Sequence, residues 1–110
     1  MNDINLMNKA ADNIRILAAS MVEKAKSGHP GGAMGGADFV NVLFSEFLVY
    51  DPKNPTWEGR DRYFQDPGHM SPMLYSVLAL TGKFTIDELK EFRQWGSVTP
   101  GHPEVNVMRG

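Results

Sequence analysis

Apolar residues recur three or four positions apart through the first quarter of the chain, and this repeat is typical of one face of a helix. The spacing predicts a helix over residues 6–25, with an apolar face formed by Met7, Ala10, Ile14, Leu17, Met21 and Ala25. Lys24 and Lys26 lie near its end, where cations suit the negative end of the helix dipole. Gly28 can adopt the left-handed conformation that ends such a helix.

The next segment, residues 29–36, holds four glycines and one proline in eight positions. That composition is unusual for a helix interior, so one interpretation is a tight linker between packed helices. The other is an anion-binding loop, because bare backbone amides hold phosphates well. The segment nevertheless fits neither the dinucleotide nor the nucleotide-binding pattern, since no lysine follows the glycines and a helix precedes them. The local pattern leaves both interpretations open.

Further along, the pattern predicts three more helices and a short strand. Residues 39–48 are hydrophobic almost all round, which predicts a helix buried on most of its surface. Residues 63–65 are expected to form the strand, after a polar loop over 57–62. A helix over 71–80 should end at Gly82, and a helix over 86–95 should begin at a capping box of Thr85 and Glu88 and end at Gly96. The tail, residues 97–110, has no helical repeat.

Composition excludes several classes of protein. The chain has 110 residues with 13 acidic and 11 basic side chains, so it lacks the positive charge of an electrostatic nucleic-acid binder. With no cysteine, it has no disulfide, thiolate zinc site or cysteine nucleophile. No stretch approaches the roughly 18 apolar residues that a membrane span needs, and the first residues do not resemble a secretory leader. We therefore expect a soluble, cytoplasmic chain.

All three histidines directly follow a glycine, at breaks between the predicted elements: His29, His69 and His102. Imidazole can gain or lose a proton near neutral pH. Each histidine alone is most simply a turn residue bonded to backbone or water, whereas the sharper hypothesis is that all three converge on one ligand. Their spacing matches no compact metal-binding motif, so we expect no metal site here. The tripeptide Gly28-His29-Pro30 also recurs as Gly101-His102-Pro103.

Five ordered segments together resemble the beginning of a transketolase. They are Lys26-Ser27-Gly28-His29-Pro30-Gly31-Gly32 with Met34-Gly35, Arg60-Asp61-Arg62-Tyr63, Gly68-His69, Phe92-Arg93-Gln94 and Thr99-Pro100-Gly101-His102-Pro103. The likeness covers residues 10–104. The chain departs from the usual family pattern at Asp66-Pro67 and at Gly32-Ala33, where the family more often has Ala-Pro.

The resemblance implies an enzyme that uses thiamine diphosphate to move a two-carbon ketol unit from a ketose phosphate, such as xylulose 5-phosphate, to an aldose phosphate in the pentose phosphate pathway. It implies catalytic roles for His29, as a proton relay, and for His102, which would contact substrate hydroxyls. It assigns His69 to the cofactor diphosphate and places the backbone of Gly32 beside the cofactor. The family's magnesium ligands include a Gly-Asp-Gly motif that this chain lacks, so they are expected outside it.

The implied fold is α/β: residues 1–110 would be the N-terminal portion of a thiamine diphosphate-binding, parallel-sheet domain, mostly helical within this span. Such a piece would carry part of a site and be inactive alone. Its expected partners are sugar phosphates and the remainder of the enzyme or a second subunit, in a homodimer, with no nucleic acid or membrane.

Alternative assignments are a dihydroxyacetone synthase, a deoxyxylulose phosphate synthase, which the full Thr-Pro-Gly-His-Pro segment disfavours, and a non-catalytic helical interaction module. The last is suggested by the largely apolar run over residues 39–48.

Overall fold

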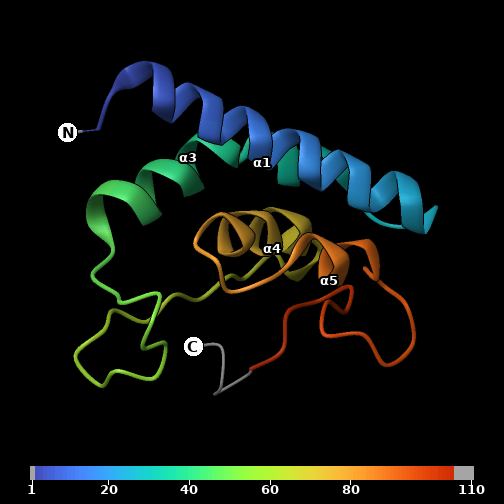
Figure 1. Cartoon of the computed structure of the whole chain (residues 1–110). Helices are drawn as coiled ribbons and strands as arrows, with labels where there is room; N and C mark the ends of the chain where they lie inside the picture. The colour runs from blue at the N-terminus through green and yellow to red at the C-terminus, as the bar shows by residue number, and fades with distance from the viewer. Residues whose placement is uncertain (1, 106–110) are drawn as a thin grey trace.

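The computed structural model describes residues 2–105, and within them every regular element is helical. The elements are α1 (Ile4–Ala25), α2 (Pro30–Gly35), α3 (Ala37–Val42), the π-helical turn η1 (Leu43–Phe47), the 3-10 turn η2 (Gly68–Met70), α4 (Ser71–Leu80) and α5 (Ile86–Lys90). Helix α1 spans the molecule, with α3 and α4 beneath it and α5 beside α4 (Figure 1). No helix in this range is long and apolar enough to cross a membrane.

Helix α1 confirms the first predicted helix. It begins where the Asp3 carboxylate accepts a hydrogen bond from the backbone N–H of Leu6 at 3.0 Å. It ends at Lys26, whose φ of 53° is left-handed and whose N–H donates to the Glu23 carbonyl at 3.2 Å. The terminating residue is therefore Lys26, and not Gly28 as the sequence suggested.

Most of the glycine-rich segment is a helix, α2, although its composition is unusual for a helix interior and predicted a linker or a loop. Pro30 stands at the first helical position, where its fixed φ favours the start of a helix. Ala33 is fully buried. A Cβ added to Gly36 would lie 2.6 Å from Met73 Sδ, so the missing side chain allows α2 and α4 to approach closely. This tertiary packing offsets the low helix propensity of glycine.

Helix α1 covers two neighbouring apolar clusters. The first is formed by Ile14, Ala18, Ala33, Ala37, Val40, Phe44, Met73 and Val77. The second is formed by Met21, Tyr75, Phe84, Leu89 and Phe92. Because α4 supplies residues to both clusters, it joins the two halves of the core.

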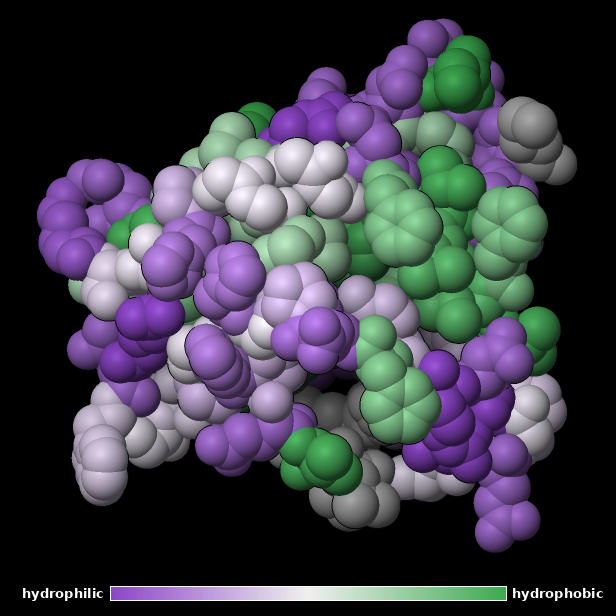
Figure 2. Space-filling model, turned by 180° about the vertical axis from the view of Figure 1, so that it is seen from behind, coloured by the Kyte–Doolittle hydropathy of each residue, from purple (hydrophilic) through white to green (hydrophobic). Residues whose placement is uncertain are grey.

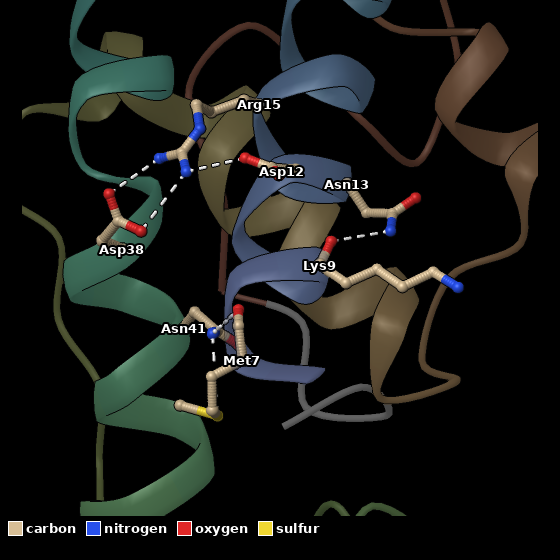
Figure 3. Close-up of polar contacts among 7 residues, drawn as sticks. All are labelled: Met7, Lys9, Asp12, Asn13, Arg15, Asp38 and Asn41. Carbon is tan, nitrogen blue, oxygen red and sulfur yellow. Dashed lines mark hydrogen bonds and ion pairs between the residues drawn. The ribbon is translucent and has the colours of Figure 1, made fainter. Parts of the chain in front are cut away.

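Polar contacts hold α1 against α3 (Figure 3). The Arg15 guanidinium donates to both carboxylate oxygens of Asp38, at 2.8 and 3.3 Å, and to Asp12 at 2.9 Å. These contacts with Arg15 hold the pKa of Asp38 below its ordinary value. Further along α3, the buried amide of Asn41 donates to the Met7 carbonyl at 2.9 Å. The register of the two helices is thus fixed at both ends of α3.

The apolar run over residues 39–48 forms α3 and η1, but it is buried on one face only. Val40 and Phe44 are buried, whereas Phe39, Val42 and Phe47 are 66%, 41% and 71% exposed. Figure 2 shows apolar side chains gathered into a patch on the back of the molecule. The expected burial on most sides is therefore wrong for this chain, because the described residues pack against one side of the helix.

The predicted strand over residues 63–65 has no regular secondary structure. A strand requires a neighbour to complete its hydrogen bonds, and the described part of the chain places none beside this segment. Tyr63 packs on the first cluster, while the neighbouring Phe64 is 87% exposed. The expectation of a strand here is wrong for residues 2–105.

Of the last two predicted helices, the one over residues 71–80 is confirmed in full and the one over residues 86–95 in part. Helix α4 has the predicted bounds. Helix α5 begins at the predicted capping box, in which Glu88 N donates to Thr85 Oγ1 at 3.1 Å and Thr85 N donates to Glu88 Oε2 at 2.9 Å. It ends at Lys90 rather than at residue 95: Glu91 already departs from helical geometry, with φ −91° and ψ 15°, and Arg93 is left-handed, with φ 63°. Residues 97–105 carry no helix, and residues 106–110 of the predicted tail lie outside the described range.

Candidate active site

The three histidines lie together although 40 and 33 positions separate them. The rings of His29 and His69 are in contact edge to face, with centroids 5.0 Å apart. His102 lies against Gly68, since a Cβ added to that glycine would be 3.0 Å from His102 Nδ1. All three side chains are exposed. The fold therefore gathers three imidazoles from three separate connections onto one surface.

His29 is positioned by the turn between α1 and α2. It is the residue before the first helical position of α2 and has an extended backbone, with φ −123° and ψ 103°. Gly28 before it has φ 130°, and a Cβ there would lie 3.2 Å from Val22 and 3.4 Å from Phe92. The position therefore favours glycine on both conformational and packing grounds.

His69 is carried by η2, which runs directly into α4. The turn is closed by the N–H of Met70, which donates to the Pro67 carbonyl at 2.9 Å. Met70 packs against Gly32 of α2, where an added Cβ would lie 2.9 Å from both Cγ and Sδ of Met70. The absence of a side chain at Gly32 thus lets η2 and α2 come close enough for the His29 and His69 rings to touch.

The loop that carries His102 is tied to the core by three side chains. Thr99 is fully buried and its hydroxyl donates to the Glu88 carbonyl at 3.0 Å. The hydroxyl of Tyr75 donates to the Pro100 carbonyl at 2.6 Å, and that of Ser71 donates to the Gly101 carbonyl at 2.5 Å. Burial, assisted by the charge of Glu104, raises the pKa of Tyr75, so its hydroxyl remains a donor well above neutral pH.

Sequence reasoning found the histidines but missed the residues that hold them. Ser71 and Tyr75 look like ordinary members of an apolar helix, because their partners lie 30 and 25 positions away. Thr99 belongs to a motif that was noticed, but its contact with Glu88 requires the fold. Within residues 2–105, no three histidine, aspartate or glutamate side chains are arranged to hold a metal ion.

Comparison with known proteins identifies the family. Residues 6–110 match the family described as transketolase, thiamine diphosphate-binding domain. The chain belongs to this family. Transketolases from Buchnera aphidicola and Escherichia coli K12 are 53% and 52% identical to it over 96% and 91% of the chain. The chain spans only 16% and 15% of those two proteins. The resemblance found in the sequence motifs is therefore confirmed, for a small part of the length of its relatives.

Solved transketolase structures share the fold of this transketolase-family chain. The enzyme from Campylobacter jejuni superposes with a TM-score of 0.89 at 46% identity, covering 98% of this chain and 17% of that one. A Pichia stipitis transketolase in complex with sedoheptulose 7-phosphate gives 0.85 at 44% identity, covering 89% of this chain and 14% of its own. The described helices are thus the helical part of a thiamine diphosphate-binding domain, which confirms the predicted fold class.

The chemistry of this transketolase-family surface follows from its exposed imidazoles. An imidazole N–H can donate to an anionic oxygen, and a neutral ring can accept a proton from a hydroxyl. Because His29 and His69 are in contact and His102 lies against the residue before His69, a single small ligand can reach more than one of the rings. The arrangement suits a ligand that combines a phosphate with a reacting carbonyl or hydroxyl.

Proposed function

We propose that this chain supplies part of the active site of a transketolase, which transfers a two-carbon ketol unit from a ketose phosphate such as xylulose 5-phosphate to an aldose phosphate. The observation that carries the proposal is the gathering of His29, His69 and His102 on one exposed surface in a chain of this family. Residues 1–110 would form the N-terminal portion of the thiamine diphosphate-binding domain, with further chain needed to complete the site.

The residues present suit thiamine diphosphate. The exposed His69 imidazole is a donor for diphosphate oxygens, and Gly32, which packs against the neighbouring Met70, is also exposed. When bound, thiamine diphosphate supplies the electron sink for making and breaking the carbon–carbon bond. In this proposal His69 binds and orients the diphosphate, and the Gly32 backbone lies beside the cofactor.

His29 and His102 are the proposed catalytic residues. His29 would hold or accept a proton at the substrate oxygen that changes between carbonyl and hydroxyl, because its ring adjoins that of His69. His102 would donate to a neighbouring substrate hydroxyl and fix its orientation. Since His102 sits on a loop tied down by Ser71, Tyr75 and Thr99, its donor is held in place before substrate arrives.

The proposal also includes parts of the enzyme outside these residues. Magnesium would be held by ligands outside these residues, and the enzyme would act as a homodimer on sugar phosphates of the pentose phosphate pathway in the cytoplasm. The exposed Phe47, Phe64 and Trp95 support a covering partner, either the remainder of the enzyme or a second subunit, because large apolar side chains left uncovered commonly mark an interface.

The test compares ketol transfer between xylulose 5-phosphate and ribose 5-phosphate by two proteins, each with thiamine diphosphate and magnesium. The full-length enzyme should turn over, and the isolated 110 residues should not. Robust turnover by the isolated chain would contradict the partial-site proposal. A full-length enzyme without ketol transfer would contradict the transketolase assignment itself.

A further inference from the structure

The tripeptide Gly-His-Pro occurs twice in this chain, and one arginine side chain lies beside the glycine of both copies. A Cβ added to Gly101 would lie 3.0 Å from Nε of Arg93 and 3.2 Å from both Cζ and Nη2. A Cβ added to Gly28 would lie 3.7 Å from the same Nε. The Arg93 guanidinium therefore lies between the loop that carries His29 and the loop that carries His102.

Two hydrogen bonds fasten Arg93 to these loops. Its Nη1 donates to the Ser27 hydroxyl at 2.9 Å, across 66 positions of sequence. Its backbone N–H donates to the Thr99 carbonyl at 3.1 Å. Ser27 lies two positions before His29, and Thr99 lies three positions before His102. A single residue thus bridges the segments that lead into both histidines.

Two features of Arg93 in this position are energetically unfavourable. Its backbone is left-handed, with φ 63°, a conformation that residues other than glycine seldom adopt. Its Nε is buried and has no hydrogen-bond partner among residues 2–105, which is uncommon in folded proteins. Features of this kind persist where the surroundings fix a residue, and they concentrate at functional sites.

From this geometry we infer that Arg93 is a positioning residue that sets the separation and orientation of His29 and His102. The inference rests on the proposed function, in which both imidazoles act on the substrate. His69 is carried separately by η2, which packs on Gly32 through Met70. Arg93 therefore contacts the segments that lead into His29 and His102, whereas the turn that carries His69 is held mainly by the packing of Met70 on Gly32.

The first experiment measures kcat, KM and the thiamine diphosphate dissociation constant for Arg93→Ala in the full-length enzyme. We expect kcat to fall by about 10- to 100-fold, since small displacements of reacting groups have effects of this size. The cofactor dissociation constant should stay within about threefold, because Met70 and Gly32, and not Arg93, hold the turn that carries His69. Arg62→Ala is the matched control: its guanidinium donates to the carbonyls of Arg60 and Glu58, in a loop without histidines, and kcat should be unchanged.

Three further variants test the same contact from other sides. Arg93→Lys keeps the charge but loses the planar fork, so it should recover only part of the lost kcat. Ser27→Ala removes the acceptor of Nη1 and should lower kcat by about three- to tenfold. Gly101→Ala places a methyl group against the guanidinium and should resemble Arg93→Ala. Because Ser27 and Arg93 act as one unit, the double variant should be no worse than Arg93→Ala alone.

A readout independent of activity is the crystal structure of each variant without cofactor. In Arg93→Ala the loop over residues 99–102 should shift by about 1 Å or more relative to His29, with no such shift in Arg62→Ala. Unshifted loops with wild-type kcat would overturn the inference, as would a loss of cofactor affinity equal to the loss of kcat.

If Arg93→Ala does not fold, an unchanged kcat in Ser27→Ala overturns the inference. If the wild-type enzyme shows no ketol transfer, the proposed function is wrong. The inference about Arg93 is still tested in that case, by the shift of the loop in the crystal structures.

Discussion

The imidazole rings of His29 and His69 lie edge to face, with their planes at 72° and their centroids 5.0 Å apart. His29 precedes α2 and His69 belongs to η2, so the contact between their rings depends on how closely these two elements pack. That packing depends on Gly32, which leaves space for the Met70 side chain. The proposed cofactor residue and one proposed catalytic residue are consequently linked through one glycine–methionine contact.

Substitution of the individual histidines should separate cofactor binding from turnover. In the full-length enzyme, His69→Ala should weaken thiamine diphosphate binding by about tenfold or more, because a hydrogen bond to a charged diphosphate is lost. His102→Ala should lower kcat while leaving that affinity within about threefold. Calorimetric titration with cofactor in the presence of magnesium measures the two affinities, and steady-state kinetics measures kcat. Equal affinities in His69→Ala and the wild type would remove the proposed role of His69 and would favour a non-catalytic module.

Tyr75→Phe should loosen the loop that carries His102. The variant leaves the Pro100 carbonyl without its donor, which should lower the stability of the full-length enzyme by about 1–2 kcal/mol and reduce kcat. Tyr63→Phe is the control, since its hydroxyl donates only a short distance along the chain, to Gln65 Oε1. Thermal unfolding and steady-state kinetics measure the two effects. If both variants behaved alike, the hydrogen bond from Tyr75 to the Pro100 carbonyl would have no special role.

The stabilising effect of the hydrogen bond from the Tyr75 hydroxyl to the Pro100 carbonyl should also be insensitive to pH across the neutral range. Burial and Glu104 raise the pKa of Tyr75 above its ordinary value of 10.0. A raised folded pKa means that the stability contribution is complete below the unfolded pKa and is lost only as pH rises through the folded one. The difference in melting temperature between wild type and Tyr75→Phe should therefore be constant from about pH 6 to pH 9. A difference that shrinks within this range would contradict the buried, protonated hydroxyl.

Gly32 and Met70 should be energetically coupled. Gly32→Ala introduces a methyl group 2.9 Å from Met70 Cγ and Sδ, and such overpacking should destabilise the enzyme by about 1–3 kcal/mol. Met70→Ala in the same chain should relieve most of that loss, which a double-mutant cycle by thermal unfolding can measure. Gly31→Ala is a matched control in the same helix, because none of the described residues lies within 4 Å of its added methyl. An additive cycle would show that the contact carries no strain.

The contact between α1 and α3 should weaken in acid. Arg15 holds the pKa of Asp38 below its ordinary value of 3.8, so its contribution to stability is present above that value and is lost as pH falls through the folded pKa. Asp38 is exposed and Arg15 is partly exposed, so Asp38→Asn should lower the melting temperature of the full-length enzyme at pH 7 by only about 1–2 °C. The difference should shrink as pH falls below 3.8 and Asp38 becomes protonated. A constant difference across this range would exclude the carboxylate as its source.

The elements with complete local signals could be predicted from the sequence. Helix α4 begins and ends where its apolar repeat and Gly82 indicate, and the Thr85–Glu88 capping box forms as expected. Helix α2 could not be predicted, because its stability comes from contacts with Met70 and Met73 rather than from glycine propensity. The exposure of Phe39 and Phe47 was also not predicted, since an apolar residue does not reveal which part of the protein covers it.

The sequence indicates which histidines form the candidate site, but not which residues hold them in place. Three Gly-His pairs and the ordered motifs identified the family and the imidazoles. The hydrogen bonds of Ser71, Tyr75 and Arg93 span between 25 and 66 positions, so no local pattern could reveal them. What the sequence lacks is the geometry that turns separate loop residues into one surface.

Phe47, Phe64 and Trp95 leave large aromatic rings in contact with water on the described part of the chain. Association with a covering partner must release the solvent that hydrates these rings. Removal of apolar surface from water gives a large negative change in heat capacity, whatever the enthalpy at one temperature. The thermodynamics of assembling the complete enzyme should therefore vary steeply with temperature.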